Sequence, residues 1–590
     1  MNAFGPSLSS GARRLRELAG SDRAVGIVAP VAAAVLALYF VIPTLMPGIS
    51  NWDTAEFQAV APVMGTAHPT GYPAYVILGW FAACVFQPFG DPAFRMNLLQ
   101  AFLAAAAVAG TVAVVQLLTG RRLIALAIGL VLACTQLFWR LSTHADPHMF
   151  HLALVAIIFV LLITWDQRRR SADATAAAHA DRWLVAAAAA YGVAVANHSL
   201  ALLLPPAIGL FVLAADWRVL LRWRTLVACI IALLATITVL FAELPIRAMM
   251  NAPVIYGHPD TVEGFKYVVL AEQFRGSLAD PLGNLGTKAD TILRLMTGWI
   301  GQPLIALGAV GLGTSLARRP RYVILSGLSL VATCIFAASY ANADISRYYL
   351  VPLMIVLTWA ALGAADLIGA AGWLVEAGRA WAFDGRVPRL SDVLAAEPSP
   401  DAEPVADDAP GRDSGTAPLR RTTPGWAPRI VLAGEVIVAA ALVFPAVNIV
   451  PLRQQPQSST NPNGVSEANQ TSDARWLAVV LAPADKGGLP KNSVIVSWWS
   501  TSTTLWYGQK VLGMRPDIYI VDDRTRLDDN LGEVQDVFNR FLGNRPVFTI
   551  RLSGGVDGME ALSTEFDIQT FTLGDGVTTI AHVIGRKESQ

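Results

Sequence analysis

The sequence predicts a polytopic α-helical membrane protein, with about eleven transmembrane helices and a soluble α/β domain at its C-terminus. The first supporting observation is composition: 54% of the 590 residues are hydrophobic and 15% are charged, whereas soluble domains carry about a quarter charged residues. The second is a series of uncharged apolar stretches, most of them close to the roughly 20 residues that cross a bilayer. The third is the regular occurrence of arginine clusters between these stretches.

The first membrane helix is expected at 24–46. This run is too long for the apolar region of a signal peptide, and no small-residue cleavage site follows it. Two other segments are irregular: the arms that meet at Asn197–His198 are short, and 74–89 lies close to Pro73 and Pro88 and is expected to be re-entrant or interfacial. Full spans after the first are predicted at 94–118, 123–139, 148–165, 183–198, 200–215, 225–243, 291–316, 321–340, 346–369 and 429–450.

Arginine clusters give the predicted orientation. With these spans, all of the clusters fall on one side, which the positive-inside rule assigns to the cytoplasm: Arg13–Arg16, Arg121–Arg122, Arg168–Arg170, Arg218–Arg224 and Arg318–Arg321. The chain then divides into a cytoplasmic N-terminal segment (1–23), a transmembrane domain (24–370), a cytoplasmic, partly disordered linker (371–428), a last transmembrane helix (429–450) and an extracytoplasmic domain (451–590).

The extracytoplasmic domain is predicted to be a small α/β layer fold. Its short strand-like runs at 493–496, 518–521, 547–550 and 578–583 alternate with a helical pattern at 529–542. The four cysteines of the chain all lie in apolar segments, so neither a zinc site nor a disulfide framework is expected. A formal net charge of zero gives no indication of a nucleic-acid partner.

The first outer loop holds the densest set of polar residues near the membrane, where such groups are costly. Asp53 and Glu56 are three residues apart and share one face if the segment is helical. Such a pair could bind a divalent metal, share a proton, or act as a general base and its orienting partner. The same spacing fits a helix N-terminus, with Asp53 as the cap and Glu56 as its capping-box partner.

The second outer loop contains His144, Asp146 and His148. These residue types resemble a metal-ligand set, although a proline between the histidines is expected to break their common face. Polar contacts to a substrate or to the first loop, or a solvated loop, are the alternatives. Asn197 and His198 interrupt an apolar stretch further along, and a buried, hydrogen-bonded structural pair is favoured there.

Arg247 and Arg347 are single cations at the predicted outer face of the membrane. Arginine favours bidentate pairing with phosphate or carboxylate groups. Each of them could therefore bind a lipid phosphate or pair with Asp53 or Glu56. Extension of the side chain toward the lipid headgroups is the third interpretation.

Taken in chain order, these motifs resemble a known family. The motifs are Asp53–Glu56, Ala67–Pro73, Arg95–Leu98, Tyr191–His198, Leu244–Arg247 and Arg347–Tyr349. The stretch that contains them, from about residue 50 to 370, resembles the transmembrane-protein-260-like branch of protein O-mannosyltransferases, multi-helix enzymes of the GT-C glycosyltransferase type.

The resemblance implies a GT-C-like fold in a bacterial plasma membrane, a polyprenyl-phosphate-linked sugar as donor and an exported protein as acceptor. Asp53 is then expected to be the general base of an inverting transfer of a sugar such as mannose, and Glu56 is expected to orient it or to hold a divalent metal. The other expected site residues are the donor phosphate and sugar contacts Arg347, Arg247, His68, Tyr72, Asn197 and His198, and the acceptor or loop contacts His144, Asp146 and His148.

Other functions stay open at this point. A transporter or flippase of lipid-linked sugars predicts acids or broken helices near mid-membrane, whereas the acids here lie at the outer face. A glycosyltransferase that acts on an envelope glycan or lipid would use the same residues. A non-enzymatic scaffold would tolerate the loss of Asp53 and Glu56.

Overall fold

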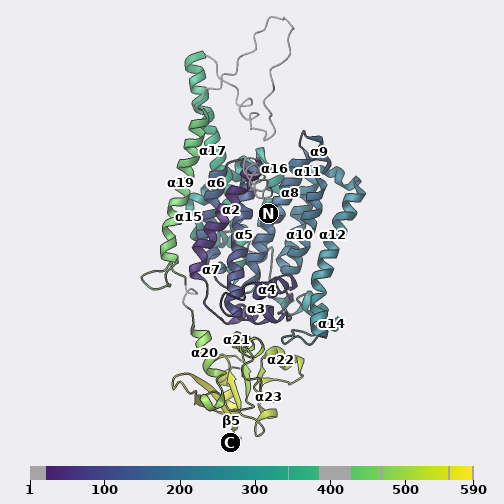
Figure 1. The fold of residues 1–590 in the computed structure, drawn as a ribbon, viewed down its shortest axis with the longest axis vertical. Coiled ribbons are helices and arrows are strands. Elements are labelled where there is room, and N and C mark those ends of the chain that lie inside the picture. Colours follow the sequence, from purple (N-terminus) through teal and green to yellow (C-terminus); the bar gives the residue numbers. More distant parts are fainter. Residues whose placement is uncertain (1–21, 343, 385–426, 466–469, 556–557, 588–590) are drawn as a thin grey trace, which may run out of the picture.

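The computed structural model describes residues 22–342, 344–384, 427–465, 470–555 and 558–587. A bundle of long helices carries an α/β unit at one end (Figure 1). Two predicted segments lie largely outside the described residues: the N-terminal segment at 1–21 and the linker at 385–426.

Helices occur at all of the predicted positions. Within the described residues, eight helices are long and apolar enough to cross a membrane, or nine if the pair α6 and α7, bent by 69°, counts as one broken span. The polytopic helical fold is therefore confirmed. α11, with 12 residues, is shorter than the span predicted at 200–215, whereas α10, with 17 residues, matches the span predicted at 183–198; neither belongs to the eight helices long enough to cross a membrane. The bundle helices are α2 (Asp22–Val41), α5 (Pro92–Thr119), α6 (Arg122–Cys134), α7 (Gln136–Ser142), α8 (Pro147–Arg169), α9 (Ala174–Ala178), α10 (Asp181–Asn197), α11 (Pro205–Asp216), α12 (Trp223–Phe241), α15 (Leu285–Arg318), α16 (Pro320–Ala337), α17 (Leu350–Asp384) and α19 (Ala427–Arg453).

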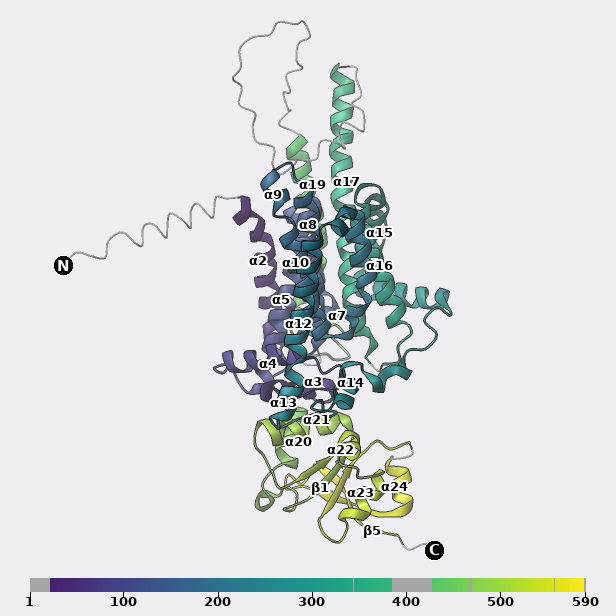
Figure 2. The ribbon, with the colours of Figure 1, turned by 90° about the vertical axis from the view of Figure 1, so that its right-hand side faces the viewer.

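Helix α17 continues to Asp384, so the linker predicted to begin at 371 is helical over its first residues. The apolar segment predicted to be interfacial forms the short helix α4 (Pro73–Val85), which lies at the end of the bundle nearest the α/β unit (Figure 2). Three more short helices lie at this end: α3 (Trp52–Val63), α13 (Glu243–Met249) and α14 (Val262–Val269).

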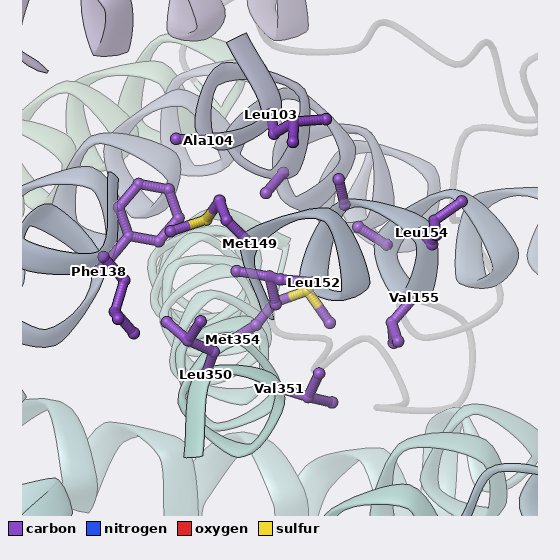
Figure 3. Close-up of a cluster of buried hydrophobic side chains, with 14 of the residues drawn as sticks. Leu103, Ala104, Phe138, Met149, Leu152, Leu154, Val155, Leu350, Val351 and Met354 are labelled. Carbon is purple, nitrogen blue, oxygen red and sulfur yellow. The ribbon is translucent and has the colours of Figure 1, made fainter. Parts of the chain in front are cut away.

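The centre of the bundle is formed by α5, α8 and α17. The most apolar windows of these helices are 72%, 72% and 89% buried, whereas those of α12 and α19 are only 6% buried, so the latter two lie at the periphery. Side chains from α5, α7, α8 and α17 meet in one apolar cluster (Figure 3): Leu103, Ala104, Phe138, Met149, Leu152, Leu154, Val155, Leu350, Val351 and Met354.

Helices α15 and α17 cross at very short range. A Cβ atom added to Gly311 would lie 1.8 Å from the carbonyl oxygen of Trp359, and one added to Gly363 would lie 2.4 Å from that of Leu307. Small residues that allow backbones to approach in this way are typical of membrane helix pairs.

The arginine-rich loops meet at the end of the bundle that lies opposite the α/β unit. Arg169 at the end of α8 pairs with Asp216 at the end of α11, at 3.0 Å. Arg321 at the start of α16 pairs with Asp166 of α8, also at 3.0 Å. Three of the clusters predicted to share one side are therefore joined or adjacent in space (Figure 1).

In the described part of the α/β unit, five strands form one sheet with the order β2-β1-β3-β5-β4. β1 is parallel to β2 and β3, and β5 is antiparallel to β3 and β4. Strand β4 was not predicted, because much of it is exposed and it lacks an apolar run. The elements are α20 (Ser472–Val480), β1 (Val494–Ser497), α21 (Trp499–Trp506), β2 (Tyr519–Val521), α22 (Asp523–Asp528), α23 (Val534–Phe541), β3 (Val547–Ile550), α24 (Met559–Glu565), β4 (Phe566–Thr572) and β5 (Thr579–Arg586).

Candidate functional site

The acidic pair of the first outer loop lies in the first two turns of α3. The residue that caps this helix is Asn51, and Asp53 already lies within the first turn. Both carboxylate oxygens of Glu56 accept hydrogen bonds from His68, one from its backbone N–H at 2.6 Å and one from Nδ1. The capping-box interpretation of Asp53 and Glu56 is therefore wrong.

Two amide side chains of α5 hold the first and second outer loops side by side. The Oδ1 atom of Asn97 accepts hydrogen bonds from Gln58 of α3 at 2.9 Å and from the backbone N–H of Ala145 at 3.0 Å. Gln100, one turn further along α5, donates to the backbone carbonyl of Asp146 at 2.8 Å. These buried contacts bring the acids of both loops to the same place.

Arg347 bridges the two loops. Its Nη2 donates to Asp53 Oδ2 at 2.9 Å, and its Nη1 donates to Asp146 Oδ2 at 3.3 Å. The side chain of Arg347 is 12% exposed and that of Asp146 is 5% exposed, so solvent screens this bridge little. The sequence left open whether Arg347 pairs with an acid, and in this structure it pairs with two.

The α/β unit contributes a side chain to the same site. Trp499, the first residue of α21, donates from Nε1 to Asp53 Oδ1 at 3.2 Å, and its ring also contacts the ring of His68. Trp499 was not among the site residues predicted from the sequence. Its only signal was the Trp498–Trp499 pair.

The surroundings keep Asp53 ionised. Burial by itself raises the pKa of this carboxyl group, but the charges of His68 and Arg347 and the hydrogen bonds from Arg347 and Trp499 outweigh it. The net effect is a lowered pKa. Both oxygens of Asp53 are thus engaged by donors in this state of the protein.

Glu56 and His68 form a buried pair that retains a proton. Burial is the largest effect on the pKa of both groups. It raises the pKa of Glu56. Burial by itself lowers the pKa of His68, but the charge and hydrogen bond of Glu56 outweigh this effect, so the pKa of His68 is also raised. The raised pKa values and the contact between Glu56 Oε2 and His68 Nδ1 favour a proton held between these two atoms. The Nε2 atom of His68 faces the hydroxyl group of Tyr72 at 3.1 Å.

Buried polar atoms without partners surround this cluster. The ring of His198 lies 4.5 Å from that of His148 and 5.5 Å from that of Tyr72. Because His198 Nδ1 accepts a hydrogen bond from a backbone N–H, a proton on the neutral ring belongs to Nε2. In the described part of the chain, no partner is found for His198 Nε2, His148 Nε2 or Arg347 Nε.

Two other residues that were predicted for the site, Arg247 and Asn197, bind backbone carbonyl groups. Arg247 donates to the backbone carbonyls of Met64 at 2.8 Å and Val63 at 3.1 Å, which corrects the expectation of a pair with Asp53 or Glu56. These carbonyls belong to the C-terminal end of α3, where cations are favourable. Asn197 donates to the carbonyl of Pro147 at 3.1 Å, which agrees with the structural interpretation of this residue.

The second outer loop does not form the metal-ligand set considered from its sequence. Asp146 caps α8 through the backbone N–H of His148 at 2.7 Å and also binds His148 Nδ1 at 2.8 Å. The charges of His148, Arg347 and His144 outweigh burial and lower the pKa of Asp146. Asp146 is therefore an ionised second anchor for Arg347.

Asp53, Glu56 and His68 form the only potential metal-binding group found in the described residues, with one ligand atom of each within 4.8 Å of the others. The donor types suit a divalent cation. However, all four carboxylate oxygens already accept hydrogen bonds from Arg347, Trp499 and His68. A cation would have to displace these donors.

Comparison with known proteins agrees with this fold. Residues 53–221 match the family model described as the N-terminal domain of protein O-mannosyl-transferase TMEM260. This stretch of the chain is therefore similar to the TMEM260 family. Protein O-mannosyl-transferase TMEM260 from Mus musculus is 26% identical over 387 residues, which cover 62% of this chain and 52% of the relative. The chain therefore matches about half the length of this curated relative.

The similar solved structures extend over nearly the whole chain. ArnT from Cupriavidus metallidurans, bound to undecaprenyl phosphate, superposes with a TM-score of 0.53 at 14% identity and covers 94% of this chain and 97% of ArnT. The apo state of ArnT gives the same TM-score and identity, with coverage of 95% and 98%. At this identity the likeness shows the fold alone, a GT-C-type membrane fold with a C-terminal sheet.

Proposed function

We propose that this protein is a membrane glycosyltransferase that moves a sugar from a polyprenyl-phosphate donor to a hydroxyl group of an exported protein. The observation that carries the proposal is the ionised Asp53, held between Arg347 of the bundle and Trp499 of the α/β unit. The activity for which the mouse relative is named supports the reaction class, and the undecaprenyl phosphate bound by ArnT supports the donor class. Mannose is the proposed sugar.

The proposed location of the reaction is the outer face of a bacterial plasma membrane. The arginine clusters occupy the end of the bundle opposite Asp53, and the positive-inside rule assigns that end to the cytoplasm. The N-terminus is then cytoplasmic and the α/β unit extracytoplasmic. Donor and exported acceptor would meet where α3, α4 and the α/β unit adjoin.

In the proposed reaction, Asp53 is the general base. The acceptor oxygen attacks the anomeric carbon and inverts it, its proton passes to the Asp53 carboxylate, and the bond between the anomeric carbon and the phosphate oxygen breaks. General-base catalysis of this kind contributes roughly 10²–10⁴-fold to a rate. The lipid phosphate leaves with the bonding electrons and therefore needs positive charge nearby.

Arg347 is the proposed partner of the leaving phosphate. Its Nε atom and the Nε2 atom of His198 are buried without partners, so both have unused hydrogen-bonding capacity. When the donor binds, Arg347 would exchange part of its ion pairing with Asp53 and Asp146 for contacts with the donor phosphate. Because the Arg347 charge and hydrogen bond lower the pKa of Asp53, this exchange would raise that pKa and make Asp53 a stronger base.

Glu56 and His68 are proposed to act as a fixed support rather than as a proton acceptor. When His68 carries the proton, its charge lowers the pKa of Asp53 and helps to keep Asp53 ionised. Tyr72, which reaches His68 Nε2, is proposed to line the sugar site. If a divalent cation bound Asp53, Glu56 and His68, it would supply Lewis-acid stabilisation, but no step above depends on one.

The proposal is tested by Asp53→Asn, which removes the base but keeps the size of the side chain and an oxygen that can accept from Trp499. Purified full-length protein would be given radiolabelled polyprenyl-phosphate mannose and an extract of exported proteins. We expect transfer to fall by about 10²–10⁴-fold, while the variant still folds and binds the donor. Its thermal stability is expected to be lower, because the ion pair with Arg347 is lost.

A matched control is Asp344→Asn. Asp344 pairs with Arg140 at 3.0 Å in the neighbouring loop and does not contact Asp53 in the described structure. We expect this variant to transfer within a few-fold of wild type. Near-native turnover by Asp53→Asn would show that Asp53 is not the base, and transfer from none of several labelled donors by the wild type would refute the glycosyltransferase assignment.

A further inference from the structure

A cavity of about 180 Å³ lies between the loop that follows α13 and the α/β unit. This volume is several times the roughly 30 Å³ that one water molecule takes in the liquid, so it can hold a side chain. One wall is the segment 253–256, and the other walls come from α21 and the turn after it, from β2 and from α22.

The cavity is connected to the candidate base through a single residue. Two of its wall residues, Tyr256 and Trp506, contact the ring of Trp499 edge-on, with centroid distances of 5.9 Å and 5.5 Å. Trp499 in turn donates to Asp53. A ligand in the cavity would therefore be separated from Asp53 by about one indole ring, on the order of 10 Å, which about three residues of extended chain can span.

The wall formed by β2 is an edge of the sheet. Among the described strands, β2 is the first in the sheet order and pairs with β1 alone. Tyr519 donates its N–H to Ser493 beside β1. Because parallel strands alternate the direction of their backbone groups, Ile520 turns its N–H and C=O away from β1, toward the edge. An extended peptide can add to such an edge through main-chain hydrogen bonds.

The two basic residues that line the cavity differ in whether their charge is already paired. Arg524 pairs with Asp528 and stacks over the rings of Tyr256 and Tyr267, so its charge is already engaged. Lys510 lines the same cavity and is exposed, and its ammonium group has no hydrogen-bond or ion-pair partner among the described residues. One positive charge is thus left to attract an acidic group.

We propose that this cavity and the edge of β2 dock an extended segment of the acceptor polypeptide, with an acidic side chain of that segment beside Lys510. The proposal rests on the proposed function and adds to it a rule for acceptor choice. The acceptor hydroxyl group would lie about three residues from the docked acidic side chain. The main chain of the acceptor would pair with Ile520.

Two variants test the docking site without touching the candidate catalytic groups. Ile255→Trp fills the cavity from the loop side, because Ile255 lines it, and Lys510→Glu reverses its unpaired charge. The matched control is Leu282→Trp, which adds the same ring at an exposed loop position that does not line the cavity.

The probes are fluorescein-labelled decapeptides with a central Thr and, three residues away, either Asp or Lys. Binding to the full-length protein is measured by fluorescence anisotropy. We expect the Asp peptide to bind wild type and the Leu282→Trp control equally, to bind both cavity variants at least five-fold more weakly, and to lose affinity when the Asp and its neighbours are N-methylated. Lys510→Glu should prefer the Lys peptide.

Equal binding of the Asp peptide by wild type and both cavity variants, or no binding to wild type, would overturn the docking site. Sugar transfer to the same peptides is measured separately. Variant-sensitive binding without transfer from any labelled donor would retain the docking site and refute the proposed function. Transfer that is insensitive to both cavity variants would retain the function and refute the docking site.

Discussion

Replacing Arg347 with Gln gives the most discriminating test of the site, because this arginine bridges two carboxylates and is the proposed partner of the leaving phosphate. Gln removes the charge but retains a hydrogen-bond donor. Loss of one donor from an oxyanion site costs about 10²–10³ in kcat, or about 2.7–4 kcal/mol. With Arg347 only 12% exposed, solvent screening reduces this figure little, and we expect kcat to fall by about that factor.

The same variant should change the pH dependence of transfer. Without Arg347, two of the effects that lower the pKa of Asp53 are lost, its charge and its hydrogen bond, so this pKa rises. The carboxylate is then protonated at higher pH than in wild type. The acid limb of the kcat/KM profile is therefore expected to move to higher pH. The stability that wild-type Asp53 contributes is present above its unfolded pKa and is lost as the pH falls through its lowered folded pKa.

The assay is transfer from labelled polyprenyl-phosphate mannose between pH 4 and 8, together with thermal unfolding. Removing one partner of a buried ion pair can cost about 3–5 kcal/mol of stability, so Arg347→Lys is included as a variant that keeps a charge but cannot bridge both acids. Arg247→Gln is the matched control, because Arg247 binds backbone carbonyls of α3. The reasoning fails if Arg347→Gln stays within three-fold of wild type with an unmoved acid limb, or if Arg247→Gln loses as much activity.

Further predictions concern the groups around this arginine. Trp499→Phe keeps an aromatic ring but removes the N–H that donates to Asp53. The acid limb of the pH profile should therefore again move to higher pH, with a several-fold lower kcat. An unmoved acid limb would contradict the role of the indole N–H. Washing the protein with EDTA should leave transfer within two-fold, since the carboxylate oxygens of Asp53 and Glu56 have protein donors; complete loss that Mn²⁺ or Mg²⁺ restores would show a resident metal. Gly311→Val should lower the unfolding free energy by about 1–3 kcal/mol through overpacking against α17, as measured by thermal denaturation; an unchanged melting temperature would contradict the close crossing.

Local sequence patterns predicted most helices well. For two of the helices, the local sequence also marks the residue at which the helix begins. Asp91 and Asp146 precede Pro92 and Pro147, and in the structure each aspartate caps the helix that the proline begins. The acid, the proline and the apolar run lie within one short window, so no distant contact is needed to interpret them. Strand β4 lacked such a signal, because pairing with β5 rather than an apolar face holds it in the sheet.

The roles of the two arginines could not be separated by the same means. Arg247 and Arg347 are both single cations beside apolar segments, and their local sequences fit phosphate binding, pairing with an acid and headgroup contact equally well. In the structure, α13 turns Arg247 toward the end of α3, while the turn before α17 points Arg347 between Asp53 and Asp146. The directions of these side chains depend on how the helices pack.

By itself, the sequence determined that the chain crosses a membrane many times, that its arginine-rich loops share one end and that its acidic pair lies near the other. These properties follow from the partition of windows of about 20 residues into a bilayer, which is a local quantity. Only the tertiary structure decided that Asp53 meets Arg347, 294 positions away, and Trp499, 446 positions away. Such contacts depend on the packing of α3, α17 and the α/β unit against one another, and no local pattern encodes the relative placement of elements so distant in the chain.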